Sequence, residues 1–216
     1  PEVMTPRLWA VSSAVVVLGV LSAQASTGGA RRTAATLKMS AATGYVLLAL
    51  WVGASESSFG RVMLAGFALC WIGDLLLIVP GRGQAFLCGL AAFLVGHLAY
   101  ATAFASLGFQ VQWAAAAFVF AVPTALWIHT WLIRSELMPR MIWPVRAYIV
   151  AISLMLVMAA SAFGAGAPLL VPVGAAAFMA SDVFVARERF VQRDPLNTGV
   201  GLPLYFLAQV LFALGL

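Results

Sequence analysis

QAFLCGLAAFLVGHLAYATAFAS, residues 84–106, decides the fold class of this chain. The stretch contains no Lys, Arg, Asp or Glu, and its apolar residues are continuous rather than alternating. About 20 such residues form a helix long enough to cross the hydrocarbon core of a bilayer. An open β-sheet would leave backbone groups unpaired in lipid, and strands of a membrane barrel alternate in polarity. We therefore predict a transmembrane helix here.

Seven further apolar runs surround this one, joined by short connections. The chain has 216 residues, of which 63% are hydrophobic and only 9% are charged, whereas about 25% of residues are charged in soluble domains. We predict an all-α, polytopic integral membrane protein, in which residues 1–216 form one domain of eight transmembrane helices. The predicted spans lie near residues 8–25, 34–53, 61–79, 84–106, 111–133, 143–163, 167–187 and 200–216. The first run resembles a signal peptide, but we expect it to be a retained span because seven similar runs follow.

The basic residues predict an orientation rather than a nucleic-acid partner. The formal net charge is +5, but the cations lie between apolar runs and form no patch interleaved with aromatic residues. Of the 12 Lys and Arg residues, only Arg7 and Arg61 fall on the side of the even-numbered loops, which leaves ten on the other side. Because cytoplasmic loops are enriched in Lys and Arg, we predict that both termini face away from the cytoplasm.

A few polar side chains lie inside the predicted spans, and such residues are functional-site candidates because they are costly in lipid. They are Asp74, Asp182, His97, Tyr205 and Gln209, with Lys38 and Arg146 at the starts of the second and sixth spans. At 1.5 Å per residue, the two aspartates and the two cations fall in the cytoplasmic half of the bilayer, and His97 falls near its middle. We expect these residues to line one cavity that opens towards the cytoplasmic leaflet.

Several of these positions recur at a constant spacing of 108 residues. Lys38 and Arg146 are separated by this distance, as are Asp74 and Asp182, and also His97 and Tyr205. The spacing suggests two four-span halves in the same orientation, related by a pseudo-twofold axis. Identity at this spacing is otherwise low, so apolar composition alone is the alternative explanation.

Buried polar residues also have simpler interpretations. A membrane aspartate can pair with Lys or Arg and only hold helices together. Two aspartates and a histidine could also bind a metal ion, although we expect no metal here. No nucleotide or redox-cofactor motif occurs in the sequence, and we expect no cofactor.

These residues belong to a series of blocks that resembles the YhhN family of membrane proteins, which includes the lysoplasmalogenases. The blocks follow one another from about residue 35 to residue 212. They are Lys38; Gly73-Asp74; Phe86, Gly89, Phe93, Gly96-His97 and Tyr100; Pro144 and Tyr148; Gly174, Phe178, Ser181-Asp182 and Phe190; and Tyr205 with Ala208-Gln209. The family commonly has Pro after the lysine of the second span, where this chain has Met39.

The resemblance implies a fold of about eight helices and the activity of a vinyl ether hydrolase in a plasma membrane, such as a bacterial inner membrane. The implied substrate is a lysoplasmalogen, which such enzymes cleave to a fatty aldehyde and glycerophosphoethanolamine or glycerophosphocholine. This hydrolysis needs a proton delivered to carbon and stabilisation of the resulting cation. One protonated and one ionised carboxyl group can divide these tasks, so Asp74 and Asp182 are the predicted catalytic pair.

The remaining candidates receive supporting roles under this hypothesis. We expect His97, Tyr100, Ser181, Tyr205 and Gln209 to position water or relay protons. We expect Lys38 and Arg146 to bind the phosphate of the headgroup. Two other functions fit the same residues: a proton-coupled transporter of lipids or small molecules, and a structural membrane protein whose polar residues join helices. The sequence leaves the oligomeric state open.

Overall fold

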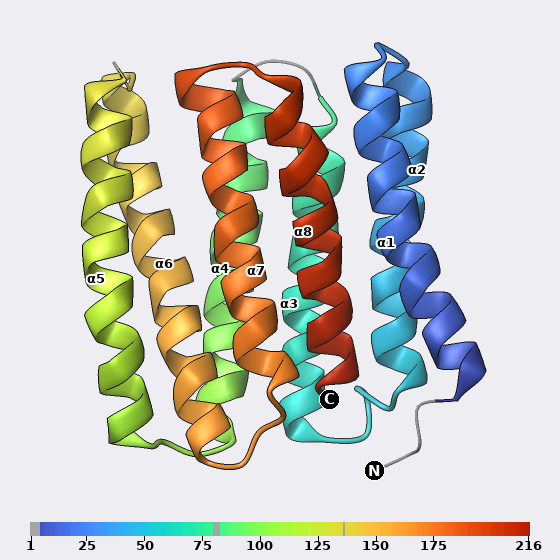
Figure 1. Cartoon of the computed structure of the whole chain (residues 1–216), viewed down its shortest axis with the longest axis vertical. Coiled ribbons are helices and arrows are strands. Elements are labelled where there is room, and N and C mark those ends of the chain that lie inside the picture. The colour runs from blue at the N-terminus through green and yellow to red at the C-terminus, as the bar shows by residue number, and fades with distance from the viewer. Residues whose placement is uncertain (1–4, 80–82, 136) are drawn as a thin grey trace.

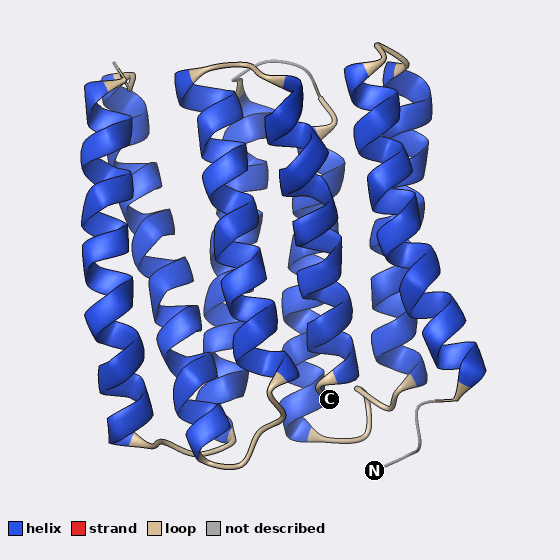
Figure 2. Cartoon of the chain, viewed as in Figure 1, coloured by secondary structure: helices blue, strands red, loops and turns tan. Residues whose placement is uncertain are grey.

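The computed structural model describes residues 5–79, 83–135 and 137–216, and these ranges contain helices but no strand (Figure 2). Eight α-helices follow one another along the chain, and a short π-helical turn, η1, continues α7. Their bounds are α1 Pro6–Thr27, α2 Arg31–Trp51, α3 Ser58–Leu77, α4 Gln84–Ser106, α5 Val111–Arg134, α6 Pro139–Gly164, α7 Leu170–Ala186, η1 Arg187–Val191 and α8 Pro195–Leu214.

Polar capping residues explain why some helices begin before the predicted spans. Helix α8 begins at Pro195 rather than near residue 200, because the Asp194 carboxylate accepts the backbone N–H of Leu196 and proline occupies the first helical position. Helix α6 begins at Pro139 rather than near residue 143; it has no side-chain cap, but proline again occupies the first helical position. Apolar runs locate the membrane-crossing part of a helix and omit a polar first turn.

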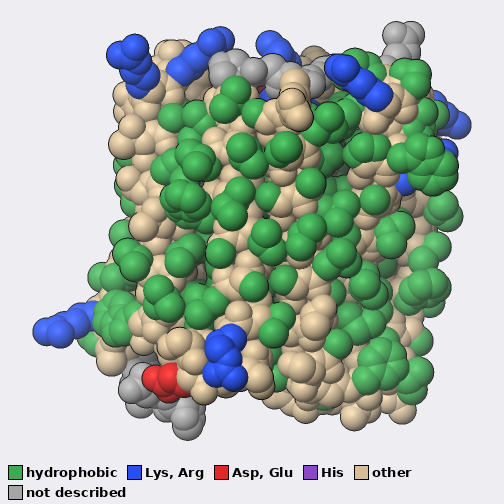
Figure 3. All heavy atoms as spheres, turned by 180° about the vertical axis from the view of Figure 1, so that it is seen from behind, with side chains coloured by type: hydrophobic (Ala, Val, Ile, Leu, Met, Phe, Trp, Pro, Cys, Tyr) green, Lys and Arg blue, Asp and Glu red, His purple; other side chains and the backbone are tan. Residues whose placement is uncertain are grey.

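All eight helices are long and apolar enough to cross a membrane, which confirms the predicted fold class. The space-filling view shows apolar side chains over the middle of the molecule and most Lys and Arg side chains at one end (Figure 3). The start of α1 and the end of α8 lie at the opposite end (Figure 1). Their position on the non-cytoplasmic side stays a prediction, and Arg82, one of the predicted cytoplasmic cations, lies outside the described residues.

The helix contacts are compatible with two related halves. Helices α3 and α4 pack together in the centre, as do α7 and α8. Helix α2 contacts α1, α3 and α8, and its counterpart α6 contacts α5, α7 and α4. The contact between α1 and α8 has no comparable counterpart between α5 and α4. The outer helices therefore depart from the symmetry that relates the inner ones.

Close packing of α3 against α4 positions the polar centre of the bundle. A Cβ atom at Gly66 would collide with the Tyr100 ring, and one at Gly73 would lie 2.6 Å from the Phe93 ring. Two aromatic rings of α4 therefore fit only because α3 has glycine at both positions. This approach holds Asp74, the neighbour of Gly73, against the buried aromatic residues of the core.

Candidate functional site

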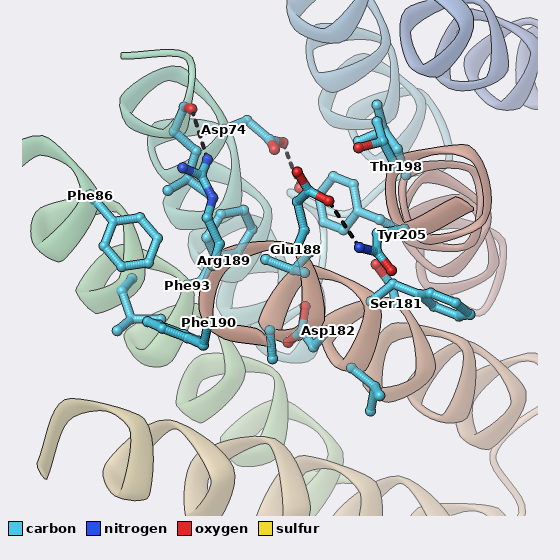
Figure 4. Close-up of a pocket in the computed structure, with 18 of the residues that line it drawn as sticks. Asp74, Phe86, Phe93, Ser181, Asp182, Glu188, Arg189, Phe190, Thr198 and Tyr205 are labelled. Atoms are coloured by element: carbon cyan, nitrogen blue, oxygen red, sulfur yellow. Dashed lines mark hydrogen bonds between the residues drawn. The ribbon is translucent and has the colours of Figure 1, made fainter. Parts of the chain in front are cut away.

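A cavity of about 420 Å³ lies in the half of the bundle remote from the termini. It is lined by the C-terminal parts of α1, α3, α5 and α7, the N-terminal parts of α2, α4, α6 and α8, and part of η1. Asp74 and Asp182 both line it, as Figure 4 shows. The structure therefore brings the two predicted catalytic residues, which come from different halves of the chain, to one cavity.

Asp74 is almost completely buried, with a side chain that is 2% exposed, and several donors surround its carboxylate. The Lys38 ammonium lies 2.9 Å from Oδ1. The Tyr205 hydroxyl donates to Oδ2 at 2.6 Å, and the Tyr45 hydroxyl donates to the same oxygen at 3.4 Å. Lys38 thus compensates the charge of Asp74 directly, and the two phenols fix the orientation of the carboxylate.

The donors to Asp74 continue into the core as a chain of hydrogen bonds. The Gln209 amide donates to the Tyr205 hydroxyl at 3.1 Å, and the Tyr100 hydroxyl donates to Gln209 Oε1 at 2.8 Å. Every donor in this chain points towards Asp74. Because hydrogen bonds in series polarise one another, the amide orientation of Gln209 supports Tyr205 as the donor to the carboxylate.

Asp182 has a different environment in the same cavity. The Tyr148 hydroxyl donates to Asp182 Oδ2 at 2.8 Å, and the His97 Nε2 atom lies 3.7 Å from this oxygen. The Asp182 side chain is 17% exposed. Within residues 5–79, 83–135 and 137–216, no Lys or Arg forms an ion pair with it. His97 itself is buried, and its ring packs edge-on against Phe178, with centroids 4.6 Å apart.

The two sites cross between the halves of the chain. Asp74 contacts Tyr205, and Asp182 lies beside His97. A shift of 108 residues exchanges the two aspartates and also relates His97 to Tyr205. Asp74 of the first half therefore lies beside Tyr205 of the second, and Asp182 of the second half lies beside His97 of the first. A pseudo-twofold axis would produce this arrangement.

Arg146, predicted to bind the headgroup beside Lys38, does not lie in this cavity. Its Nε atom donates to His129 Nε2 at 3.0 Å, between α6 and α5, and its guanidinium lies 5.1 Å from the Trp143 ring. The lining residues that the structure describes do not include it. The expectation that Arg146 lines one cavity with Lys38 therefore has to be corrected: Lys38 reaches Asp74, whereas Arg146 contacts His129 of α5 and the ring of Trp143.

The supporting residues fall into two layers. Ser181 and Tyr205 line the cavity, and the Ser181 hydroxyl donates to the backbone carbonyl of Gly201 at 2.8 Å. His97, Tyr100 and Gln209 are buried behind the lining. The second layer can therefore act on the cavity only through the groups in front of it.

Two tyrosines that the sequence analysis left out of the site contact the aspartates directly. Tyr45 donates to Asp74, and Tyr148 donates to Asp182. Tyr148 stood among the blocks of the family resemblance, which was a usable signal. The position of Tyr45, within an apolar helix and without a partner at the 108-residue spacing, gave none.

Part of the cavity lining, which we call the apolar arm, comes from α4, α5 and α6. Its walls are apolar side chains from these three helices, namely Phe86, Leu90, Phe93, Ile128, Leu132, Val145 and Ile149. Charged residues line the other part of the cavity, near the end of the bundle: Arg31, Lys38, Glu188 and Arg189. The cavity is therefore amphipathic and suits a ligand that has both a polar and an apolar part. The two aspartates line the same cavity.

The described part of the chain contains no group of three His, Cys, Asp or Glu residues placed to hold a metal ion. The Asp74 oxygens are already engaged by Lys38, Tyr205 and Tyr45. The two free cysteines differ in exposure: Cys70 is buried and Cys88 is exposed.

Comparisons with known proteins identify the family. The model of the YhhN family matches residues 33–216. The lysoplasmalogenase TMEM86B of Rattus norvegicus is 31% identical over 173 residues, and this match covers 78% of the present chain and 67% of the rat protein. No solved structure gives a significant match. The family model covers both aspartates and the cavity-lining helices from α2 onwards, although not α1, and it confirms the resemblance described above: the chain belongs to the YhhN family.

Proposed function

We propose that this protein is a membrane-embedded hydrolase that cleaves the vinyl ether bond of lysoplasmalogen. The products are a fatty aldehyde and glycerophosphoethanolamine or glycerophosphocholine. The observation that carries the proposal is the pair Asp74 and Asp182 at one amphipathic cavity. The similarity of this chain to a lysoplasmalogenase supports the choice of substrate.

The reaction requires an acid, a carboxylate and one water molecule. In our proposal, a carboxylic acid donates its proton to the outer carbon of the vinyl group, and the electron pair of the ether oxygen stabilises the resulting cation. Water adds to the carbon bonded to that oxygen and gives up a proton to a carboxylate. The hemiacetal then breaks its carbon–oxygen bond, which releases the aldehyde and the free hydroxyl of the glycerol.

The contacts of the two aspartates support a division of these tasks. Asp74 has the Lys38 ammonium and two phenols beside it, which suits a group that remains a carboxylate and faces a developing positive charge. Asp182 has one phenol donor and no ion pair with Lys or Arg in the described ranges. We assign Asp182 as the proton donor and Asp74 as the carboxylate that stabilises the cation.

The apolar arm and the charged end of the cavity fit the two ends of the substrate. The alkyl chain would lie between α4, α5 and α6, and the phosphate would lie near Lys38 and Arg189. Lys38 would then bridge the headgroup and Asp74. His97, Gln209 and Tyr100 keep the tyrosine and carboxyl groups of the cavity in position.

The experiment is an aldehyde-release assay with purified protein in detergent. Lysoplasmalogen should be cleaved, and the matched lysolipid with a saturated ether should not, because a saturated ether cannot be protonated on carbon to give the cation. Asp74→Asn and Asp182→Asn should each lower turnover at least about a hundredfold and remain monodisperse. Glu56→Gln, an exposed acid at the opposite end of the bundle, is the matched control and should keep full activity.

Three outcomes separate the competing functions. Activity of more than a few per cent in both aspartate variants would contradict the acid–base pair. Movement of lipid across sealed vesicles without bond cleavage would favour the transporter, which the paired halves of the chain also suit. Loss of folding in both variants would favour a purely structural role for the aspartates.

A further inference from the structure

Glu188 is a third acidic residue of the cavity lining, and the proposed catalysis does not use it. It lies on the π-helical turn η1, which continues α7 beyond Asp182. Single π-helical turns next to α-helices frequently occur at functional sites. Figure 4 shows Glu188 and Arg189 together with both aspartates around the cavity.

The loop before α8 holds the Glu188 carboxylate in a fixed orientation. Its Oε2 atom accepts the backbone N–H of Asp194 at 3.0 Å and the side-chain amide of Asn197 at 2.9 Å. Asn197 is itself fixed, because it also donates to the carbonyl of Gln192 at 2.8 Å and accepts from Arg187 at 2.7 Å. The carboxylate is therefore positioned in advance, with two hydrogen bonds on one of its oxygens.

The charge of Glu188 has no cationic counterpart in the described ranges, where no Lys, Arg or His lies within 4.0 Å of it in an ion pair. Two of the lining cations have other contacts: Lys38 pairs with Asp74, and Arg189 donates to the carbonyl of Leu77 and lies over the Phe86 ring. A fixed carboxylate that lines a cavity without a protein cation is suited to a cationic group of a ligand.

The position of Glu188 matches the layout of a phospholipid headgroup. Six residues separate it from Asp182, which corresponds to a rise of about 9 Å along the helix. The glycerol and phosphate of a lysolipid bridge a comparable distance between the ether oxygen and the headgroup nitrogen. Lys38, Arg31 and Arg189 line the same end of the cavity and supply positive charge for the phosphate.

We propose that Glu188 binds the ammonium group of a zwitterionic headgroup and so selects ethanolamine or choline lysolipids over lysolipids without a headgroup cation. This inference rests on the proposed function and adds a specificity-determining residue to it. The charges of the ligand then alternate with those of the protein: the phosphate faces the cations, and the ammonium faces Glu188.

The test compares two vinyl ether substrates, lysoplasmenylethanolamine and the corresponding lysolipid that ends at the phosphate. Glu188→Gln keeps the shape and the hydrogen-bond acceptor but removes the charge. We expect KM for the ethanolamine substrate to rise about tenfold, the loss expected from one charge-assisted contact, with kcat little changed. KM for the phosphate-only substrate should stay the same or fall. Glu188→Asp should retain part of the preference, and Glu56→Gln should retain all of it.

A binding measurement separates this inference from the proposed function. Saturated ether analogues with and without the ethanolamine group are titrated into wild-type and Glu188→Gln protein, so that no cleavage is needed. If Glu188→Gln binds the ethanolamine analogue more weakly than wild type does, but binds the other analogue equally well, the role of Glu188 is supported even if no vinyl ether is hydrolysed. An equal preference in wild type and Glu188→Gln would overturn it. So would the absence of any preference in wild-type protein, whether or not the variant folds.

Discussion

The Asp74 and Asp182 sites occupy equivalent places in the two halves of the chain, yet their partners differ. Asp74 is 2% exposed and has an ammonium group and two phenols within hydrogen-bonding reach. Asp182 is 17% exposed, accepts one phenol and lies 3.7 Å from His97. The comparison teaches that two carboxyl groups can share one cavity while the residues around them give them different electrostatic surroundings.

The difference originates at two pairs of equivalent positions. Lys38 reaches Asp74, whereas its counterpart Arg146 turns away to His129. Tyr205 donates to Asp74, whereas its counterpart His97 only lies near Asp182. Different partners favour different protonation states for two carboxyl groups, so this asymmetry supports the proposed division between acid and carboxylate.

The largest expected effect comes from removing the cation of the Asp74 site. Lys38→Met leaves a buried carboxylate without its partner and should lower the free energy of unfolding by about 3–5 kcal/mol. Chemical denaturation in mixed micelles measures this. The double variant Lys38→Met/Asp74→Asn should regain most of the loss, because no buried charge remains. If the two single effects simply add, the ion pair does not stabilise the site as described.

The next effect compares the phenols of the two sites. Tyr148→Phe removes the hydrogen bond that Asp182 accepts, and such a bond to the charged carboxylate that forms when Asp182 gives up its proton contributes about 1.5–3 kcal/mol. Turnover should therefore fall about tenfold or more. Tyr205→Phe should have a smaller effect, since Lys38 and Tyr45 still hold Asp74. Steady-state kinetics of both variants decide this, and equal losses would argue against the stated asymmetry.

The smallest effect is expected at Arg146. Arg146→Met removes the contacts with His129 and Trp143, which lie outside the cavity. Turnover and KM should stay within about twofold of wild type. Substitutions away from a core or a functional site typically change the free energy by less than about 0.5 kcal/mol. A large rise in KM would show that Arg146 does bind the headgroup and that the two halves are more alike than their contacts suggest.

The fold was largely predictable from the sequence, and so was the pairing of the aspartates. Continuous apolar runs force helices in lipid, and intramembrane Asp74 and Asp182 stood out because charge is rare there. The 108-residue spacing predicted equivalent positions but misplaced Arg146, since a spacing fixes the backbone position of a residue and not the side of the helix on which its side chain finds a partner. The roles of Tyr45 and Glu188 had no sequence signal.

The sequence by itself determined that the chain is a bundle of membrane-spanning helices with two acids near one end, because the bilayer allows few other structures and few buried charges. Only the tertiary structure decided which partners each acid receives, that Arg146 faces away, and that a π-helical turn brings Glu188 to the cavity. Those outcomes depend on helix rotation and on loop hydrogen bonds, which arise from contacts between segments far apart in the chain.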